Sequence, residues 1–80
     1  TEERRKDYVK LAHEIAERGK VAVRNIRRKT KEGIDKATKD GDFGEDEGKR
    51  LLTDLDKATK KATEEIDTLL ETKEKEILSV

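Results

Sequence analysis

Five cationic side chains lie close together in the first half of the sequence, within the run KVAVRNIRRKTK. Cations at intervals of one helical turn, roughly 5 to 6 Å apart, suit a polyphosphate backbone better than a single carboxylate ligand. Arginine also favours bidentate contact with phosphate. This basic ridge consists of four residues within about 60° of one another on a helix, and one at their flank: Lys20, Arg24, Arg27 and Lys31, with Arg28 beside them. It predicts a surface that binds nucleic acid.

A second interpretation of the basic ridge is a solvated face whose cations pair with carboxylates elsewhere in the chain. Residues 1–39 carry 13 Lys/Arg and 7 Asp/Glu, a net charge of +6, whereas residues 40–80 carry 7 and 13, a net charge of −6. Such asymmetry fits attraction between two packed elements as well as a polyanionic partner. Because Tyr8 and Phe43 are the only aromatic residues, we expect any nucleic acid to be bound through its backbone and not by base stacking.

Two long amphipathic helices must position these residues. Apolar and small residues recur at steps of three and four along residues 2–39 and again along residues 45–78, which predicts a helix over each range. Between them, the stretch DGDFGEDEG holds three of the five glycines, and we expect a turn at residues 40–44. Helices of about 50 to 57 Å joined by so short a loop must pack antiparallel. The expected fold is all-α, a long antiparallel helical hairpin.

The apolar stripe of each expected helix is broader than one partner helix can cover. Several of its members are alanine or glycine, so an isolated hairpin should be only marginally stable. We therefore expect a third helix to complete the core, from a segment outside these residues or from another molecule. The stripe residues are Tyr8, Ala12, Ile15, Gly19, Ala22, Ile26, Gly33 and Ala37 in the first helix, and Leu52, Leu55, Thr59, Ala62, Ile66, Leu69 and Ile77 in the second.

The composition indicates one small intracellular domain. Of the 80 residues, 50% are charged and 30% are hydrophobic, which is near the lower limit for closing a core. The absence of cysteine excludes a disulfide framework and favours a reducing compartment. The longest apolar run, residues 21–23, is far too short for a membrane span or a signal peptide. We expect a cytoplasmic protein with no contact with a membrane.

No set of residues indicates catalysis, a cofactor or a metal. His13 is the single histidine, without a cysteine or second histidine to complete a ligand set. The acidic turn has Glu45 and Leu51 where a calcium loop needs glycine and a bidentate glutamate. A glycine-rich phosphate loop and a nucleophile motif are both missing. We expect a protein that is not an enzyme and that uses no cofactor.

Three strings and the turn resemble the ribosome recycling factor family of bacteria. The strings are TEERRKDYVKLA, VAVRNIRRKT and KEKEIL, and the turn fits the family pattern KDG-x-x-x-EDE. The resemblance covers essentially all 80 residues. It implies two of the three helices of an elongated three-helix bundle. The other helix would be the N-terminal helix of the same protein, with a small β domain inserted between it and Thr1; both are missing from this sequence.

The same resemblance implies a function in translation. In the family, the bundle lies on the large ribosomal subunit in the space used by tRNA and, with elongation factor G, splits the post-termination ribosome. The RNA-contacting arginines of the V-R-N-x-R-R string correspond to Arg24, Arg27 and Arg28, which would meet the rRNA backbone. Gly44 stands where the family often has serine, which predicts a weaker helix cap. For these 80 residues alone we expect weaker binding and no splitting.

A purely structural hairpin that self-associates through its apolar stripes is the competing hypothesis. It predicts helicity that rises with protein concentration and no response to rRNA. A ribosome-binding module instead predicts rRNA binding that weakens steeply with salt.

Overall fold

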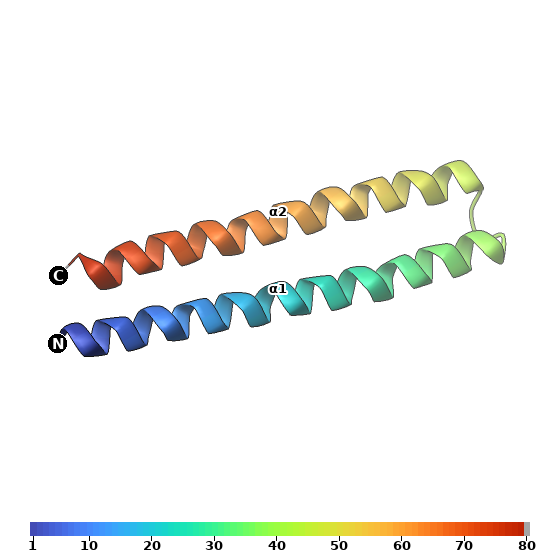
Figure 1. Cartoon of the computed structure of the whole chain (residues 1–80). Helices are drawn as coiled ribbons and strands as arrows, with labels where there is room; N and C mark the ends of the chain where they lie inside the picture. The colour runs from blue at the N-terminus through green and yellow to red at the C-terminus, as the bar shows by residue number, and fades with distance from the viewer. Residues whose placement is uncertain (80) are drawn as a thin grey trace.

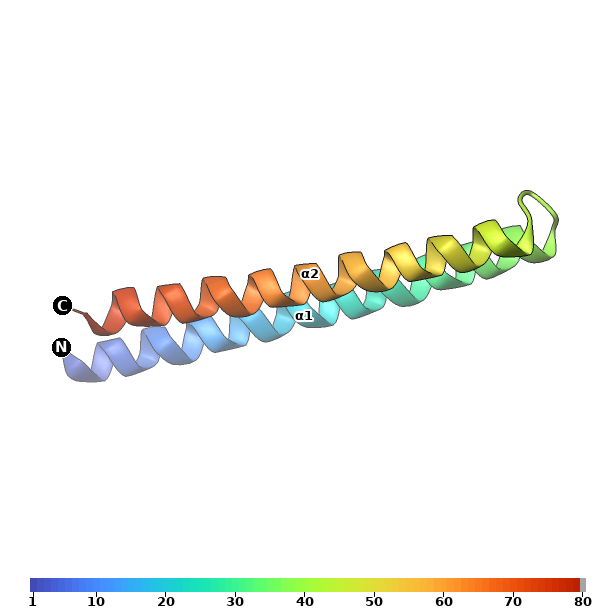
Figure 2. The same cartoon turned by 90° about the horizontal axis from the view of Figure 1, so that it is seen from above.

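The chain forms two long antiparallel helices joined by a short turn, in a computed structural model that describes residues 1–79 (Figure 1). Helix α1 spans Glu2–Lys39 and helix α2 spans Glu45–Leu78. The two views in Figures 1 and 2 show a flat rod, with the start of α1 and the end of α2 at the same end. Its Cα atoms extend over 60 × 15 × 9 Å. The expected all-α antiparallel hairpin is confirmed, and neither helix has a stretch apolar enough to cross a membrane.

Local signals at the helix ends explain where the chain turns. The Thr1 hydroxyl accepts a hydrogen bond from the Arg4 N–H at 3.3 Å and so caps the start of α1. Both helices begin with acidic residues and end with basic ones, as the helix dipole favours. Gly41 has a φ of 77°, a left-handed conformation that favours glycine. Gly44 occupies the N-cap of α2 without a side-chain hydrogen bond, so this helix start lacks the stabilisation that a serine would add.

The first turn of α2 is fixed by a second local contact. Arg50 donates two hydrogen bonds to Glu47, one of them from Nε at 3.0 Å. These hydrogen bonds hold the pKa of Glu47 below its ordinary value. A lowered folded-state pKa means that the pair stabilises the hairpin above the ordinary pKa of a glutamate, and that this stabilisation is lost as the pH falls through the lowered value. Since both side chains are exposed, the contribution is small.

The helices meet along a narrow seam and enclose no core. Within the described residues only Gly48 is buried, and no hydrophobic side chain is. Apolar side chains in the seam are half-buried because two helices cover each other on one side only. The half-buried apolar residues include Val9, Ala12, Ala16, Val23, Ile34 and Ala37 of α1, and Leu52, Leu55, Ala62, Ile66, Leu70 and Ile77 of α2.

The seam on α1 is rotated away from the stripe that the sequence pattern indicates. Tyr8, Ile15 and Ile26, which the pattern places in the seam, are 56%, 57% and 63% exposed. The half-buried residues lie one position further along, at Val9 and Ala16. This part of the expected stripe is therefore wrong by about 100° around the helix axis.

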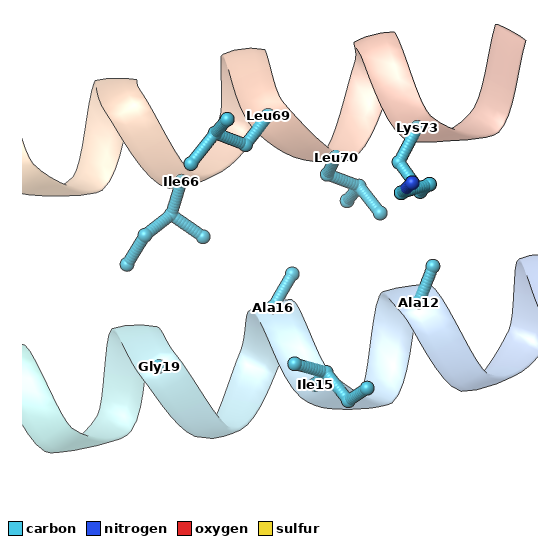
Figure 3. A pocket seen from close by; sticks show the side chains of 8 residues that line it. All are labelled: Ala12, Ile15, Ala16, Gly19, Ile66, Leu69, Leu70 and Lys73. Carbon is cyan, nitrogen blue, oxygen red and sulfur yellow. The ribbon is translucent and has the colours of Figure 1, made fainter. Parts of the chain in front are cut away.

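Small residues on α1 explain the rotation. Figure 3 shows Ala12 and Ala16 of α1 facing Ile66 and Leu70 of α2. A Cβ added to Gly19 would lie 3.4 Å from Cδ1 of Ile66. The small side chains therefore let α2 approach closely on this side, whereas the bulkier isoleucines would hold it away.

One broad face of the rod is left uncovered as a result. We call it the open apolar face, and it comprises Tyr8, Leu11, Ile15 and Ile26 of α1 and Leu69 of α2, all of them exposed. The expectation that two helices alone leave the stripes partly uncovered is met by these exposed side chains.

Gly48→Ala is expected to destabilise the hairpin by about 1 to 3 kcal/mol, although alanine is the better helix former. A Cβ at Gly48 would overlap the Thr38 hydroxyl and lie 3.3 Å from the Thr38 methyl carbon. That hydroxyl donates a 2.8 Å hydrogen bond to the carbonyl oxygen of Ile34, which holds the side chain in place. The midpoint of urea unfolding, followed by helicity, measures the effect.

Gly33→Ala is the matched control, because a Cβ there would meet no described atom within 4 Å. It is expected to stabilise the hairpin by up to about 1 kcal/mol. Shifts of the same sign for both variants would contradict the close contact between Gly48 and Thr38.

Candidate nucleic-acid interface

The basic ridge and the open apolar face lie on opposite sides of the rod. At about 100° per residue, the centre of the ridge is about 150° around α1 from Ile15 and Ile26. The seam with α2 lies between them. The rod therefore has one apolar broad face and one charged broad face, and the five cations predicted from their spacing do share a side of one helix.

Two of the ridge cations reach the acidic helix. Arg27 contacts Oδ1 of Asp56 through Nε at 3.0 Å and through Nη2 at 2.8 Å. Lys20 forms an ion pair with Asp67. Both cations are half-buried at the edge of the seam, because the rotation of the seam by one residue brings them close to α2. The charge asymmetry of the sequence indicated attraction between the helices, but not these partners.

The other three ridge cations point away from α2. Arg24 donates to Oε1 of Glu17 at 3.1 Å and Lys31 donates to Oδ2 of Asp35 at 2.7 Å, both within α1. Arg28 is exposed and has no ion pair among residues 1–79. Four of the five cations thus have a carboxylate partner, which leaves the ridge with one net positive charge.

The partners of the ridge reduce its charge but do not close it off. Each pair is solvent-exposed to a substantial degree, and exposed ion pairs contribute only about 0 to 1 kcal/mol. A polyanion with closely spaced phosphates can therefore replace the carboxylates at small cost. Arg24 and Arg28 are the most available, since neither is held at the seam.

Two further lysines, which spacing within the ridge alone does not indicate, continue the row toward the start of α1. Lys6 and Lys10 stand 18 residues before Arg24 and Arg28, a distance of five helical turns, so they lie on the same side. Both are exposed, and neither pairs with a described carboxylate. From Lys6 to Arg28 the row extends over about 33 Å at 1.5 Å per residue. The signal for them was the 18-residue interval, which the sequence already contains.

Comparison with known proteins places the chain in a family. The family model described as ribosome recycling factor matches residues 1–78. Over its whole length the chain is 76% identical to the ribosome-recycling factor of Bifidobacterium longum (strain DJO10A) and 55% identical to that of Thermobifida fusca (strain YX). It is 59% identical over 98% of its length to that of Kocuria rhizophila.

The match extends over only part of these relatives. The chain covers 44% of the Bifidobacterium protein, 43% of the Thermobifida protein and 42% of the Kocuria protein, so it spans less than half of their length. No solved structure matches it significantly. The family model nevertheless covers nearly the whole chain, including the entire basic ridge, and the chain therefore belongs to the ribosome recycling factor family.

Proposed function

We propose that this chain binds the rRNA of the large ribosomal subunit through the basic ridge. As part of the longer protein, it would help elongation factor G to split post-termination ribosomes in the cytoplasm. Membership of the ribosome recycling factor family is the observation that carries the proposal. The row of exposed cations on one side of α1 supports it, because contacts with phosphates supply most of the affinity for a nucleic acid backbone.

Within the ridge, Arg24 and Arg28 are the residues we expect to contact phosphate most directly. Arg28 has no carboxylate partner among the described residues, and Arg24 is 57% exposed with a single partner on its own helix. Arg27 binds phosphate only by releasing Asp56, so it contributes less than an unpaired arginine would. Lys20 is held by Asp67 in the same way, whereas Lys31 can exchange its partner freely.

The proposal is for a binding protein, not an enzyme. Each role assigned to the ridge is the neutralisation of phosphate by a cation, and none needs a bond to be made or broken. Because the charged broad face has few aromatic residues, contact with the RNA backbone explains the interface better than base readout does.

The test is a titration of the chain with large-subunit rRNA at two salt concentrations. Four phosphate contacts predict a slope of log affinity against log salt of about −3 to −4. The affinity should then fall about 100-fold between roughly 50 and 200 mM salt. A flat salt response, or no binding at the lower salt concentration, would contradict the proposal.

A structural hairpin without RNA binding is the second candidate. The cross-helix ion pairs of Lys20 with Asp67 and Arg27 with Asp56 favour it, because they give part of the ridge a role in joining the helices. Under this alternative, removal of ridge cations lowers the stability of the hairpin and rRNA has no effect on it. Unfolding and rRNA binding, measured on the same variants, separate the two candidates.

A further inference from the structure

The open apolar face contains a groove between the two helices. The groove has a volume of about 420 Å³. Figure 3 shows the eight residues that line it, with Ile15 and Leu69 at its rim. Seven of them are apolar or glycine, and Lys73 is the eighth. Together with the exposed Tyr8 and Ile26, the groove forms a continuous apolar surface of the kind that marks an interaction site.

The size of the open apolar face fits a protein partner. The broad side of the rod measures 60 by 15 Å between Cα atoms, an area of about 900 Å². A standard stable protein–protein interface buries about 800 Å² on each partner. A partner that covers the whole face therefore makes an interface of ordinary size.

The two long edges of the open apolar face carry opposite charges. At about 100° per residue, Arg18 and Lys29 border the face on α1, and Asp54 and Glu65 border it on α2. Arg18, Lys29 and Glu65 have no ion pair among residues 1–79, and Asp54 has only a 3.9 Å contact with Arg50. A partner that fits both edges must itself carry one acidic and one basic edge.

We propose that a second copy of this chain covers the open apolar face. The two copies would form a four-helix bundle around a twofold axis parallel to the rods, with α1 of each copy lying over α2 of the other. Each basic edge then meets an acidic edge. A twofold axis perpendicular to the rods would instead place α1 over α1, and like charges would oppose one another.

The heights of the charges along the rod agree with this arrangement. Arg27 and Asp56 are in contact, so they define one level on the two helices. Arg18 is nine residues before Arg27 and Glu65 is nine residues after Asp56, so in antiparallel helices they lie at one height. By the same count, Lys29 is two residues after Arg27, and Asp54 is two before Asp56.

The apolar side chains match in height as well. Ile15 is twelve residues before Arg27 and Leu69 is thirteen after Asp56, so their heights differ by one residue, about 1.5 Å. In the dimer, Ile15 of each copy therefore lies against Leu69 of the other, over the mouth of the groove. The basic ridge stays exposed on the outer face, so the dimer does not rest on the proposed binding of rRNA.

The first test measures the mass of the 9.2 kDa chain by sedimentation over a hundredfold range of concentration. We expect a dimer that dissociates on dilution. Leu69→Asp should weaken the dimer at least tenfold without loss of helicity at low concentration, since Leu69 is 69% exposed in the single chain. Val21→Asp is the control, because Val21 is exposed but lies away from the open apolar face, and it should leave the dimer intact.

The second test is a charge exchange across the interface. Arg18→Glu and Glu65→Arg should each weaken the dimer several-fold, and the double variant should restore it, since each copy then supplies the complementary pair with signs reversed. The proposal is overturned if the chain remains a monomer over the whole range. It is also overturned if Leu69→Asp leaves the mass unchanged, or if the double variant is no better than the single ones.

A monomer would leave a helix from the rest of a longer protein as the occupant of the face. Binding of rRNA is read independently, from the salt slope, so failure of the dimer and failure of the ridge give different results. Leu69→Asp should keep the rRNA affinity of the parent chain, because Leu69 lies on the broad face opposite the ridge.

Discussion

The double variant Arg24→Ala/Arg28→Ala is expected to weaken binding to large-subunit rRNA at least about tenfold at low salt. Both guanidinium groups are exposed on the outer side of α1, and neither contacts α2. Loss of two phosphate contacts should also reduce the slope of log affinity against log salt by about 1.4 to 1.8. Helicity should not fall, because alanine is the strongest helix former. Titration of both proteins at several salt concentrations gives affinity and slope together.

The matched control is Lys57→Ala/Lys75→Ala, which removes the same charge from α2. Both lysines are exposed and point away from α1, about 170° from the seam. This variant should bind rRNA nearly as well as the parent chain, with the salt slope unchanged. If the two double variants lost equal affinity, binding would depend on total charge, and the assignment of the interface to the basic ridge would be wrong.

Ile66→Ala is expected to have the largest effect on folding, a loss of about 2 kcal/mol or more. Ile66 is half-buried in the seam, and its Cδ1 approaches the backbone of Gly19 so closely that a Cβ there would be 3.4 Å away. No side chain on α1 can move in to fill the space that Ile66 leaves, since glycine has none. A small domain without an enclosed core has only a few kcal/mol of stability to lose.

Urea unfolding followed by helicity, at a protein concentration low enough to keep the chain monomeric, measures this loss. Val21→Ala is the control, because Val21 is 42% exposed and lies outside both the seam and the open apolar face. It should change the free energy of unfolding by no more than about 0.5 kcal/mol. A midpoint for Ile66→Ala equal to that of Val21→Ala would show that the seam does not hold the hairpin together.

Much of the candidate site was predictable because it depends on positions within a single helix. The ridge residues share a side of α1 for the same reason that the spacing of Arg24 and Arg28 from Lys6 and Lys10 places all four there, namely the fixed rotation per residue. The carboxylates that neutralise the ridge are a different matter. Asp56 reaches Arg27 only because of how α2 is turned and shifted along α1, and a single helix holds no information about that.

The sequence by itself determined the helices, the turn and the distribution of charge. The threonine cap at residue 1, the glycine at position 41 and the 3.6-residue period are local signals, and each acts through residues a few positions apart. They also showed that the apolar stripes were too wide for two helices. Tertiary structure alone decided which half of the α1 stripe meets α2.

That choice depended on contact between side chains of different helices. The stripe of α1 offers α2 two adjacent surfaces of similar hydrophobicity, and hydropathy does not distinguish them. Close packing does, because Ala16 and Gly19 admit Ile66 where Ile15 would hold α2 at a greater distance. The same rotation draws Lys20 and Arg27 to the acidic helix, since a turn of one residue moves every side chain of a rigid helix together.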